Sequence, residues 1–229
     1  MRGDQNGLNT YPWCKMILVG IDLSGPANSI ETAVAWFEKT GNTLQYLDSR
    51  AGADDRCIFN LVSEISRTHE SVIGLDAPLS YNIGGGDRAR DAQLRRLVIA
   101  AGLPPGAVMA PTMTRMGYLT LRGISVARCL ENIELRTPRI VEVHPGASLA
   151  LRGASVRDIQ RIRRDGSARL NILKFLEDQG LDGVGNVGTT CHHLISACAG
   201  ALSAWAWASG NAVWIARKEL PYHPYDFVC

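Results

Sequence analysis

The stretch ILVGIDLSG, residues 17–25, is the main clue to the fold, because its β-branched and apolar residues predict a buried strand that begins at Met16 and ends at Asp22. The Ser-Gly-Pro sequence that follows is typical of a turn. Asp22 is therefore a single carboxylate at the end of a strand that otherwise suits the protein interior. Such a charge needs a partner, because burying an unpaired carboxylate is costly.

Two other apolar stretches carry an acidic residue near their carboxyl ends. Asp76 lies in SVIGLDAPLS, residues 71–80, and Glu142 lies in RIVEVHPGAS, residues 139–148. The carboxyl ends of parallel strands meet at one edge of an α/β sheet, so we expect these carboxylates to lie close to that of Asp22. Hard oxygen ligands suit Mg²⁺ or Mn²⁺, and a pair of such ions can hold both the attacking and the leaving oxygen of a phosphodiester displacement. The three acids thus predict a metal site.

Each acid also has a purely structural interpretation, which the sequence leaves open. Asp22 can accept backbone hydrogen bonds in the turn that follows it, and Asp76 can cap the loop at Ala-Pro. Glu142 can form an ion pair with one of the many arginines. His144 and the histidine pair 192–193 belong to a residue type that is more often packed or hydrogen-bonded than a ligand.

Segments of strand-like and helical periodicity surround the three acidic strands. Gly41-Asn42 splits residues 31–49 into the two strands of a hairpin. A glycine-rich loop, GGG at 84–86, is only a weak match to a phosphate-binding loop and leads into a basic helix that stops at Gly102. Other helices are predicted at 55–68, around 118–135, at 156–178 and at 191–210, and a short final strand at 211–216.

The order of these elements predicts an α/β fold. We expect a mixed β-sheet, with an antiparallel hairpin plus parallel strands, that is flanked by helices. Extra helices are expected between the fourth and fifth strands. The small residues of the segment 191–210 predict a helix that can pack closely on this sheet.

Length and composition indicate one globular domain at 16–229, preceded by an N-terminal extension at 1–15. The chain has 229 residues, of which 46% are hydrophobic and 20% charged. No apolar run reaches the roughly 18 residues of a membrane span, and the extension lacks the apolar core of a signal peptide. Six cysteines lie far apart without a C-x-x-C pair, which favours reduced thiols. We therefore expect a soluble, cytoplasmic protein with no membrane partner.

The net charge of +2 hides a basic central segment. Residues 87–169 contain 15 arginines, no lysine and seven acidic residues, a balance of +8. The planar guanidinium group suits phosphate oxygens, so a nucleic acid or nucleotide partner is one interpretation. Solvated helix faces in an arginine-rich composition are the other.

Several short motifs, taken together in order, resemble the domain-of-unknown-function family of predicted RNase H-like nucleases (DUF429-like). They cover about residues 16–216, and their order and spacing are more specific than any one of them. The motifs are Gly20-Ile21-Asp22, Asp76-Ala77-Pro78, RARDAQLRR with Asp91 and Arg95, Arg122-Gly123, Glu142-Val143-His144-Pro145, and HHLISA in the last helix. The resemblance implies an RNase H-like sheet and metal-dependent phosphodiester hydrolysis.

The resemblance also implies roles for individual residues. Two aspartates of the family's last helix align with His193 and Ser196, and serine is a poorer metal ligand than a carboxylate. One anionic ligand is thus missing, which would weaken a second metal site or abolish catalysis. The resulting hypothesis has Asp22, Asp76 and Glu142 binding Mg²⁺ or Mn²⁺, His193 activating water, and arginines of 88–96 and 115–122 binding phosphates, specifically Arg88, Arg90, Arg95 and Arg122.

Two other functions are compatible with the same residues. A non-catalytic protein of this fold would bind nucleic acid or a nucleotide through the basic central segment. Phosphotransfer is a third interpretation, because GIDLSG is faintly similar to the first phosphate loop of sugar kinases and actin-like ATPases. The chain is shorter than the two such domains that those proteins use.

Overall fold

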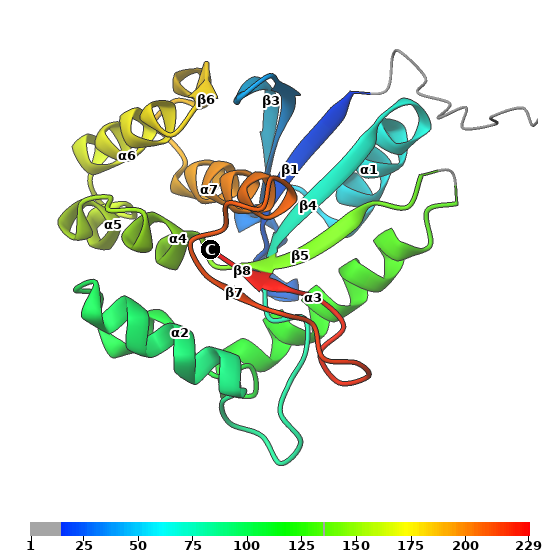
Figure 1. The fold of residues 1–229 in the computed structure, drawn as a ribbon, viewed down its shortest axis with the longest axis vertical. Coiled ribbons are helices and arrows are strands. Elements are labelled where there is room, and N and C mark those ends of the chain that lie inside the picture. The colour runs from blue at the N-terminus through cyan, green and yellow to red at the C-terminus, as the bar shows by residue number, and fades with distance from the viewer. Residues whose placement is uncertain (1–14, 135) are drawn as a thin grey trace, which may run out of the picture.

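A computed structural model describes residues 15–134 and 136–229. The predicted N-terminal extension, residues 1–15, lies outside this description except for Lys15. The described chain folds around one eight-stranded mixed sheet with the strand order β6-β3-β2-β1-β4-β5-β8-β7, and helices cover both of its faces (Figure 1). The α/β prediction is confirmed.

The long strands of the sheet form where apolar alternation predicted them. The first strand runs over Met16–Asp22. It pairs antiparallel with the hairpin on one side and parallel with the fourth strand on the other. Gly41 makes the hairpin turn with a positive φ of 58°, which glycine adopts without strain. The strands are β1 Met16–Asp22, β2 Ala33–Thr40, β3 Thr43–Ala51, β4 Glu70–Asp76 and β5 Arg139–Val143, with the short β6 Leu181–Asp182, β7 Ile215–Ala216 and β8 Phe227–Val228.

The helices include the two that were predicted between the fourth and fifth strands, α2 and α3. The first helix begins after Asp54, whose side chain accepts a hydrogen bond of 2.7 Å from the Cys57 backbone N–H. The α-helices are α1 Asp55–Thr68, α2 Ala89–Ala100, α3 Thr114–Glu131, α4 Pro145–Leu151, α5 Val156–Arg161, α6 Gly166–Asp178 and α7 His192–Ala208, and the 3₁₀ helices are η1 Pro26–Glu31, η2 Pro105–Ala107 and η3 Val184–Val187.

The prediction of one continuous helix over 156–178 was wrong. The helix breaks after Arg161, and α6 starts afresh behind Asp165, whose carboxylate accepts hydrogen bonds from the Ser167 and Ala168 backbone N–H groups. An aspartate competes for backbone donors in this way and therefore favours a new helix start over a continuing helix. The helix α4 and the strand β8 were not predicted.

The last helix, α7, lies directly against β1 and β4 because both strands carry a glycine at the crossing (Figure 1). A Cβ atom on Gly20 would lie 1.8 Å from the Ala197 carbonyl oxygen, and one on Gly74 would lie 2.4 Å from the Gly200 carbonyl oxygen. These glycines thus allow a close helix–sheet contact. That contact places the first turn of α7 beside the carboxyl end of β1.

Apolar cores lie on both faces of the sheet and show which way each acid points. Leu18 and Val141 pack in the core under α7, whereas Leu75 packs in the core under α1 and α3. Parallel neighbours in register share a face of a sheet. Asp22 is in register with Asp76, and Leu75 is in register with Glu142. Asp22 and Asp76 therefore project to the α7 face, and Glu142 projects to the opposite face.

Two predictions about the whole chain concern membranes and cysteines. None of the helices within 15–134 and 136–229 has the length and apolarity to cross a membrane. The five cysteines in this part of the chain are free thiols, at positions 57, 129, 191, 198 and 229. Cys14 lies outside the described residues, and the reduced state of the thiols stays a prediction.

Candidate functional site

A cavity of about 750 Å³ opens at the carboxyl ends of β1, β4 and β5. Its walls come from these strand ends, from η1 and the loop before it, from the first turns of α3 and from the start of α7. The four predicted catalytic residues, Asp22, Asp76, Glu142 and His193, all line it. The expectation that the acidic strand ends meet at one edge of the sheet is therefore met, although the acids do not form one cluster.

Asp22 and Asp76 form a carboxyl pair in this cavity. They lie side by side on neighbouring parallel strands, and their side chains are within hydrogen-bonding reach of each other. Burial raises the pKa of Asp22, although the hydrogen bond and the charge of His193 oppose this shift. Burial and the adjacent Asp22 carboxylate, with a further contribution from Glu142, raise the pKa of Asp76 well above its usual range. Two carboxyl groups in this position hold a shared proton or need a cation.

His193 joins the carboxyl pair from the first turn of α7. Its Nδ1 atom is 2.8 Å from Asp22 Oδ2, and both side chains are about one-fifth exposed or less. The hydrogen bond to Asp22 raises the pKa of His193, although burial opposes this shift. The His192 ring stacks on His193 at 3.9 Å, and burial together with the neighbouring charge of His193 lowers the pKa of His192 to about 4. The two histidines of this pair are thus shifted in opposite directions, the pKa of His193 upward and that of His192 downward.

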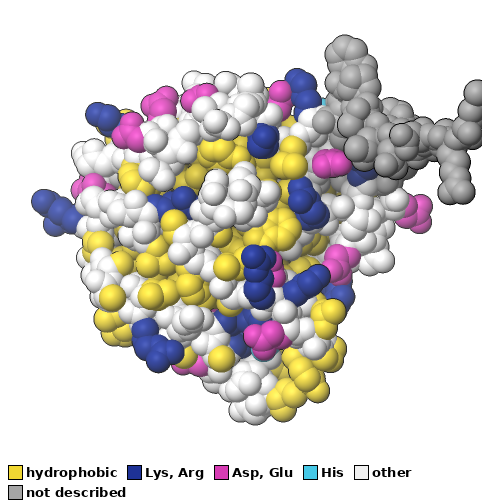
Figure 2. All heavy atoms as spheres, in the orientation of Figure 1, with side chains coloured by type: hydrophobic (Ala, Val, Ile, Leu, Met, Phe, Trp, Pro, Cys, Tyr) yellow, Lys and Arg dark blue, Asp and Glu magenta, His cyan; other side chains and the backbone are white. Residues whose placement is uncertain are grey.

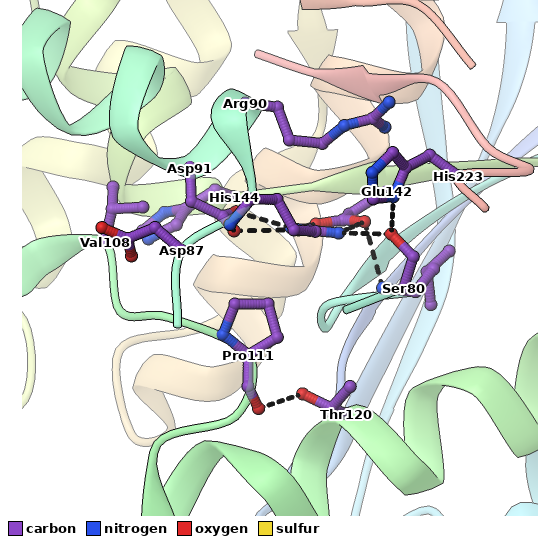
Figure 3. Close-up of polar contacts among 12 residues, drawn as sticks. Ser80, Asp87, Arg90, Asp91, Val108, Pro111, Thr120, Glu142, His144 and His223 are labelled. Carbon is purple, nitrogen blue, oxygen red and sulfur yellow. Dashed lines mark hydrogen bonds and ion pairs between the residues drawn. The ribbon is translucent and has the colours of Figure 1, made fainter. Parts of the chain in front are cut away.

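Glu142 forms a buried ion pair with Arg88. Figure 3 labels Glu142 together with Asp91 and Ser80, the other side chains of this network. Both Glu142 oxygens accept from the Arg88 guanidinium, and one also accepts from the Leu79 backbone N–H at 3.0 Å. Arg88 also binds Asp91 through Nε and Nη2, and Ser80 through Nη1 at 2.9 Å. All five N–H donors of Arg88 are thereby used, and its side chain is 1% exposed. The ion-pair interpretation of Glu142 is the one that the structure shows.

The other three arginines predicted to bind phosphate also have protein partners. Arg90 donates to the Tyr225 and Arg217 carbonyl oxygens, and Figure 3 draws no contact between it and the Glu142 network. The partners of Arg95 are Asp87 and the Val108 carbonyl oxygen, and those of Arg122 are Asp55, Ser24 and Thr32. These contacts account for each guanidinium without a ligand, and the phosphate role of all four arginines stays a prediction.

Two other arginines face the cavity, Arg115 from α3 and Arg163 from the break between α5 and α6. Both are exposed, and within the described residues neither has an acidic partner within 4 Å. Arg115 belongs to the segment 115–122 that was predicted to contact phosphates, whereas Arg163 was missed. The sequence signal that could have identified Arg163 is Asp165. An aspartate there can cap a new helix, and this predicts a turn at Arg163 instead of a continuous helix. Figure 2 shows that Lys and Arg side chains are otherwise spread over the visible face.

The residues of the cavity fit a divalent cation only in part. Within 15–134 and 136–229, no group of three or more His, Cys, Asp or Glu side chains is arranged to hold a metal ion. Among the described residues, the only cationic side chain within 4 Å of the Asp22 and Asp76 oxygens is His193, whereas the Glu142 oxygens are occupied. His144 is held by the Ala107 carbonyl oxygen at 2.8 Å. A cation at this site would therefore have two carboxylate ligands from the described chain.

The remaining predicted elements lie away from the cavity. Ser196, on the second turn of α7, is not among the residues that line it within the described chain. The glycine loop 84–86 is also outside it, and the Gly86 backbone N–H donates to Thr112 Oγ1 at 2.7 Å. This contact is consistent with a structural loop.

The model of the family described as Protein of unknown function (DUF429) matches residues 20–220. No curated protein and no solved structure matches the chain.

Proposed function

The chain belongs to the family described as Protein of unknown function (DUF429), and we propose that it is a phosphodiester hydrolase, a nuclease, that depends on Mg²⁺ or Mn²⁺. We further infer an RNase H-like core. The arrangement of β3, β2, β1, β4 and β5, with β2 antiparallel and the others around β1 parallel, supports this inference because it is the hairpin-plus-parallel sheet that the resemblance implies.

The observation that carries the proposal is the Asp22–Asp76 pair beside His193. Two adjacent carboxyl groups with raised pKa values are stabilised by a bound cation, which removes the need for a shared proton. Mg²⁺ is usually bound through one or two carboxylates, with waters and substrate phosphates as its other ligands. Two carboxylates are what this cavity offers. Such an ion, when bound, would neutralise charge that develops on the phosphate oxygens.

His193 is the residue proposed to accept a proton from the attacking water. Asp22 contacts Nδ1 and thereby orients the ring, which leaves Nε2 for the substrate side. The same contact stabilises the imidazolium that forms when the proton is taken up. Cleavage should accordingly become faster as the pH rises through the pKa of His193.

Arg88 is proposed to be a positioning residue. It holds Glu142 and Asp91 in the cavity wall and cannot donate to a phosphate without losing one of these contacts. Arg115 and Arg163 are the exposed cations that face the cavity and are therefore the proposed phosphate contacts.

The proposal is tested by incubating the purified protein with single-stranded and duplex DNA and RNA in Mn²⁺ or Mg²⁺. We expect cleavage that EDTA stops. His193→Gln should reduce it by roughly a hundredfold or more, the contribution of a general base, and Asp22→Asn and Asp76→Asn, which each remove a metal ligand, should reduce it at least as much. Asp178→Asn, at an exposed aspartate near the end of α6, is the matched control and should cleave normally. Undiminished cleavage by Asp22→Asn would refute the site.

The alternatives give different results in the same experiment. Salt-sensitive binding of nucleic acid with no cleavage under any metal condition would indicate a non-catalytic binding protein. Binding of ATP in calorimetry, with no nucleic acid bound, would indicate a phosphotransferase.

A further inference from the structure

One face of α3 forms part of the cavity wall. Arg115, Met116, Tyr118 and Leu119 line it, at the spacing that places residues on one side of a helix. Tyr118 is 65% exposed, although it is a large aromatic side chain in a cavity wall. The cavity thus offers a flat aromatic ring and an arginine one helical turn apart.

A second hollow, of about 510 Å³, lies over the break between α5 and α6. Arg161, Arg163 and Arg164 line it, and Arg163 also lines the main cavity, so the two hollows meet at this residue. All three arginines are exposed. A row of cations therefore leads out of the cavity.

The break that carries these arginines is a built turn. Arg169 Nη1 donates to the Ile162 carbonyl oxygen at 2.9 Å, and the Asp165 carboxylate caps α6. Asp165 is thus committed to backbone N–H groups, and in the described part of the chain no salt bridge within 4 Å joins it to the three arginines. These contacts fix the backbone of the turn, and among the described residues the three arginine side chains have no acidic partner within 4 Å, so their charge is available to an outside partner.

We propose, building on the proposed function, that the substrate is single-stranded nucleic acid, with a base stacked on Tyr118 and the backbone leaving the cavity over Arg161, Arg163 and Arg164. An aromatic ring can stack on a base only when that base has left its duplex neighbours. The arginines outside the main cavity would be superfluous for a mononucleotide, whereas a longer strand reaches them. DNA and RNA share this chemistry, and the experiment distinguishes them.

The inference is tested by fluorescence anisotropy of labelled twelve-residue DNA and RNA strands, their duplexes and a mononucleotide. Binding is measured on Asp22→Asn protein in EDTA, so that cleavage does not interfere. We expect the protein to bind the single strand with higher affinity than the duplex or the mononucleotide, because only the single strand contacts both hollows. Tyr118→Ala should weaken strand binding by about fivefold to a hundredfold, the range for one base–aromatic stack, and Tyr118→Phe should retain it.

The arginine row has its own readout in the salt dependence of binding. Replacing Arg161, Arg163 and Arg164 by alanine should make the slope of log K against log salt shallower by about 2, at about 0.7 for each phosphate contact of a single strand. The controls are Arg67→Ala, at an exposed arginine of α1, and Tyr222→Ala, at an exposed tyrosine outside both hollows. Both variants should bind the strand normally. Circular dichroism checks that each variant is folded.

The outcomes separate this inference from the proposed function. Selective strand binding that depends on Tyr118 supports the inference even when the unsubstituted protein cleaves nothing, a result that counts against the nuclease proposal alone. Equal affinity for single strand and duplex, or for strand and mononucleotide, would overturn the inference even when cleavage is observed. Unchanged affinity and salt slope in the Tyr118 and arginine variants would overturn it as well.

Discussion

Replacing Arg88 by methionine should destabilise the protein more than any other single change in the cavity wall. Methionine fills part of the volume but carries no donors, so the Glu142 and Asp91 carboxylates lose their cation while they stay buried. Both acids are at most 3% exposed in their side chains, so water cannot replace the guanidinium without opening the wall.

The size of the effect follows from this burial. Removing one partner of a buried ion pair costs about 3–5 kcal/mol, chiefly because an uncompensated charge remains. A domain with about 5–15 kcal/mol of stability loses a large fraction of it in this way. Since 1 kcal/mol corresponds to about 2–4 °C in a chain of this length, the melting temperature should fall by about 6–20 °C.

The assay is urea unfolding followed by circular dichroism, in a double-mutant cycle with Glu142→Gln. The double variant Arg88→Met/Glu142→Gln should be clearly more stable than the sum of the single effects predicts. Arg88→Met alone leaves two unpaired buried carboxylates, Glu142 and Asp91, whereas the double variant leaves only Asp91. Arg96→Met, at an exposed arginine on the same helix, should change the free energy of unfolding by less than about 0.5 kcal/mol. A loss below 1 kcal/mol for Arg88→Met, or additive effects in the cycle, would refute this reasoning.

Three further predictions concern the helix contact and the titrating groups. Gly20→Ala should cost about 1–3 kcal/mol or more in urea unfolding, because the new Cβ would overlap the backbone of α7. Asp76→Asn should be more stable than the unsubstituted protein at pH 8 and lose this advantage toward pH 4. The Asp76 carboxyl has a higher pKa in the folded chain than in the unfolded chain. Its ionisation therefore lowers the free energy of unfolding as the pH rises from the unfolded-state pKa through the folded-state pKa. In NMR titration, the pKa of His193 should lie above its ordinary value and should decrease in Asp22→Asn, whereas the pKa of His192 should be about 4.

Each of these three predictions can be contradicted by a specific result. Gly117→Ala, at a helical glycine with open space around it, is the control for Gly20→Ala, and equal stability of the two variants would contradict the close contact. A difference between Asp76→Asn and the unsubstituted protein that is the same at pH 4 and pH 8 would show that Asp76 has an ordinary pKa. An unchanged His193 titration in Asp22→Asn would show that the two residues do not interact in solution.

Local pattern was sufficient to predict most elements and part of the site. The apolar run before Asp22, the hairpin at Gly41 and the helix behind Asp54 all follow from short-range preferences, and the structure contains each of them. The ends of the acidic strands meet at one cavity, as parallel strand order requires. The small residues of α7 likewise predicted its close packing on the sheet.

The partners of the acids and arginines depend on the tertiary structure. Alternation along one strand tells which residues share a face within that strand, but the face of Glu142 relative to Asp76 depends on the register between β4 and β5. The register pairs Glu142 with Leu75, and this places Glu142 beside Arg88 instead of beside Asp76.

The long strands of the sheet, their acidic ends and the histidine at the start of the last helix could be predicted from the sequence, because they follow from the spacing of residues close together in the chain. The sequence did not show that Asp22 contacts both Asp76 and His193, that Glu142 is neutralised by Arg88, or that Arg163 lines the cavity, because these contacts form only in the folded chain. The physical reason is that the desolvation cost of a buried charge is met by whichever partner the folded chain brings within hydrogen-bonding distance, at any separation in sequence.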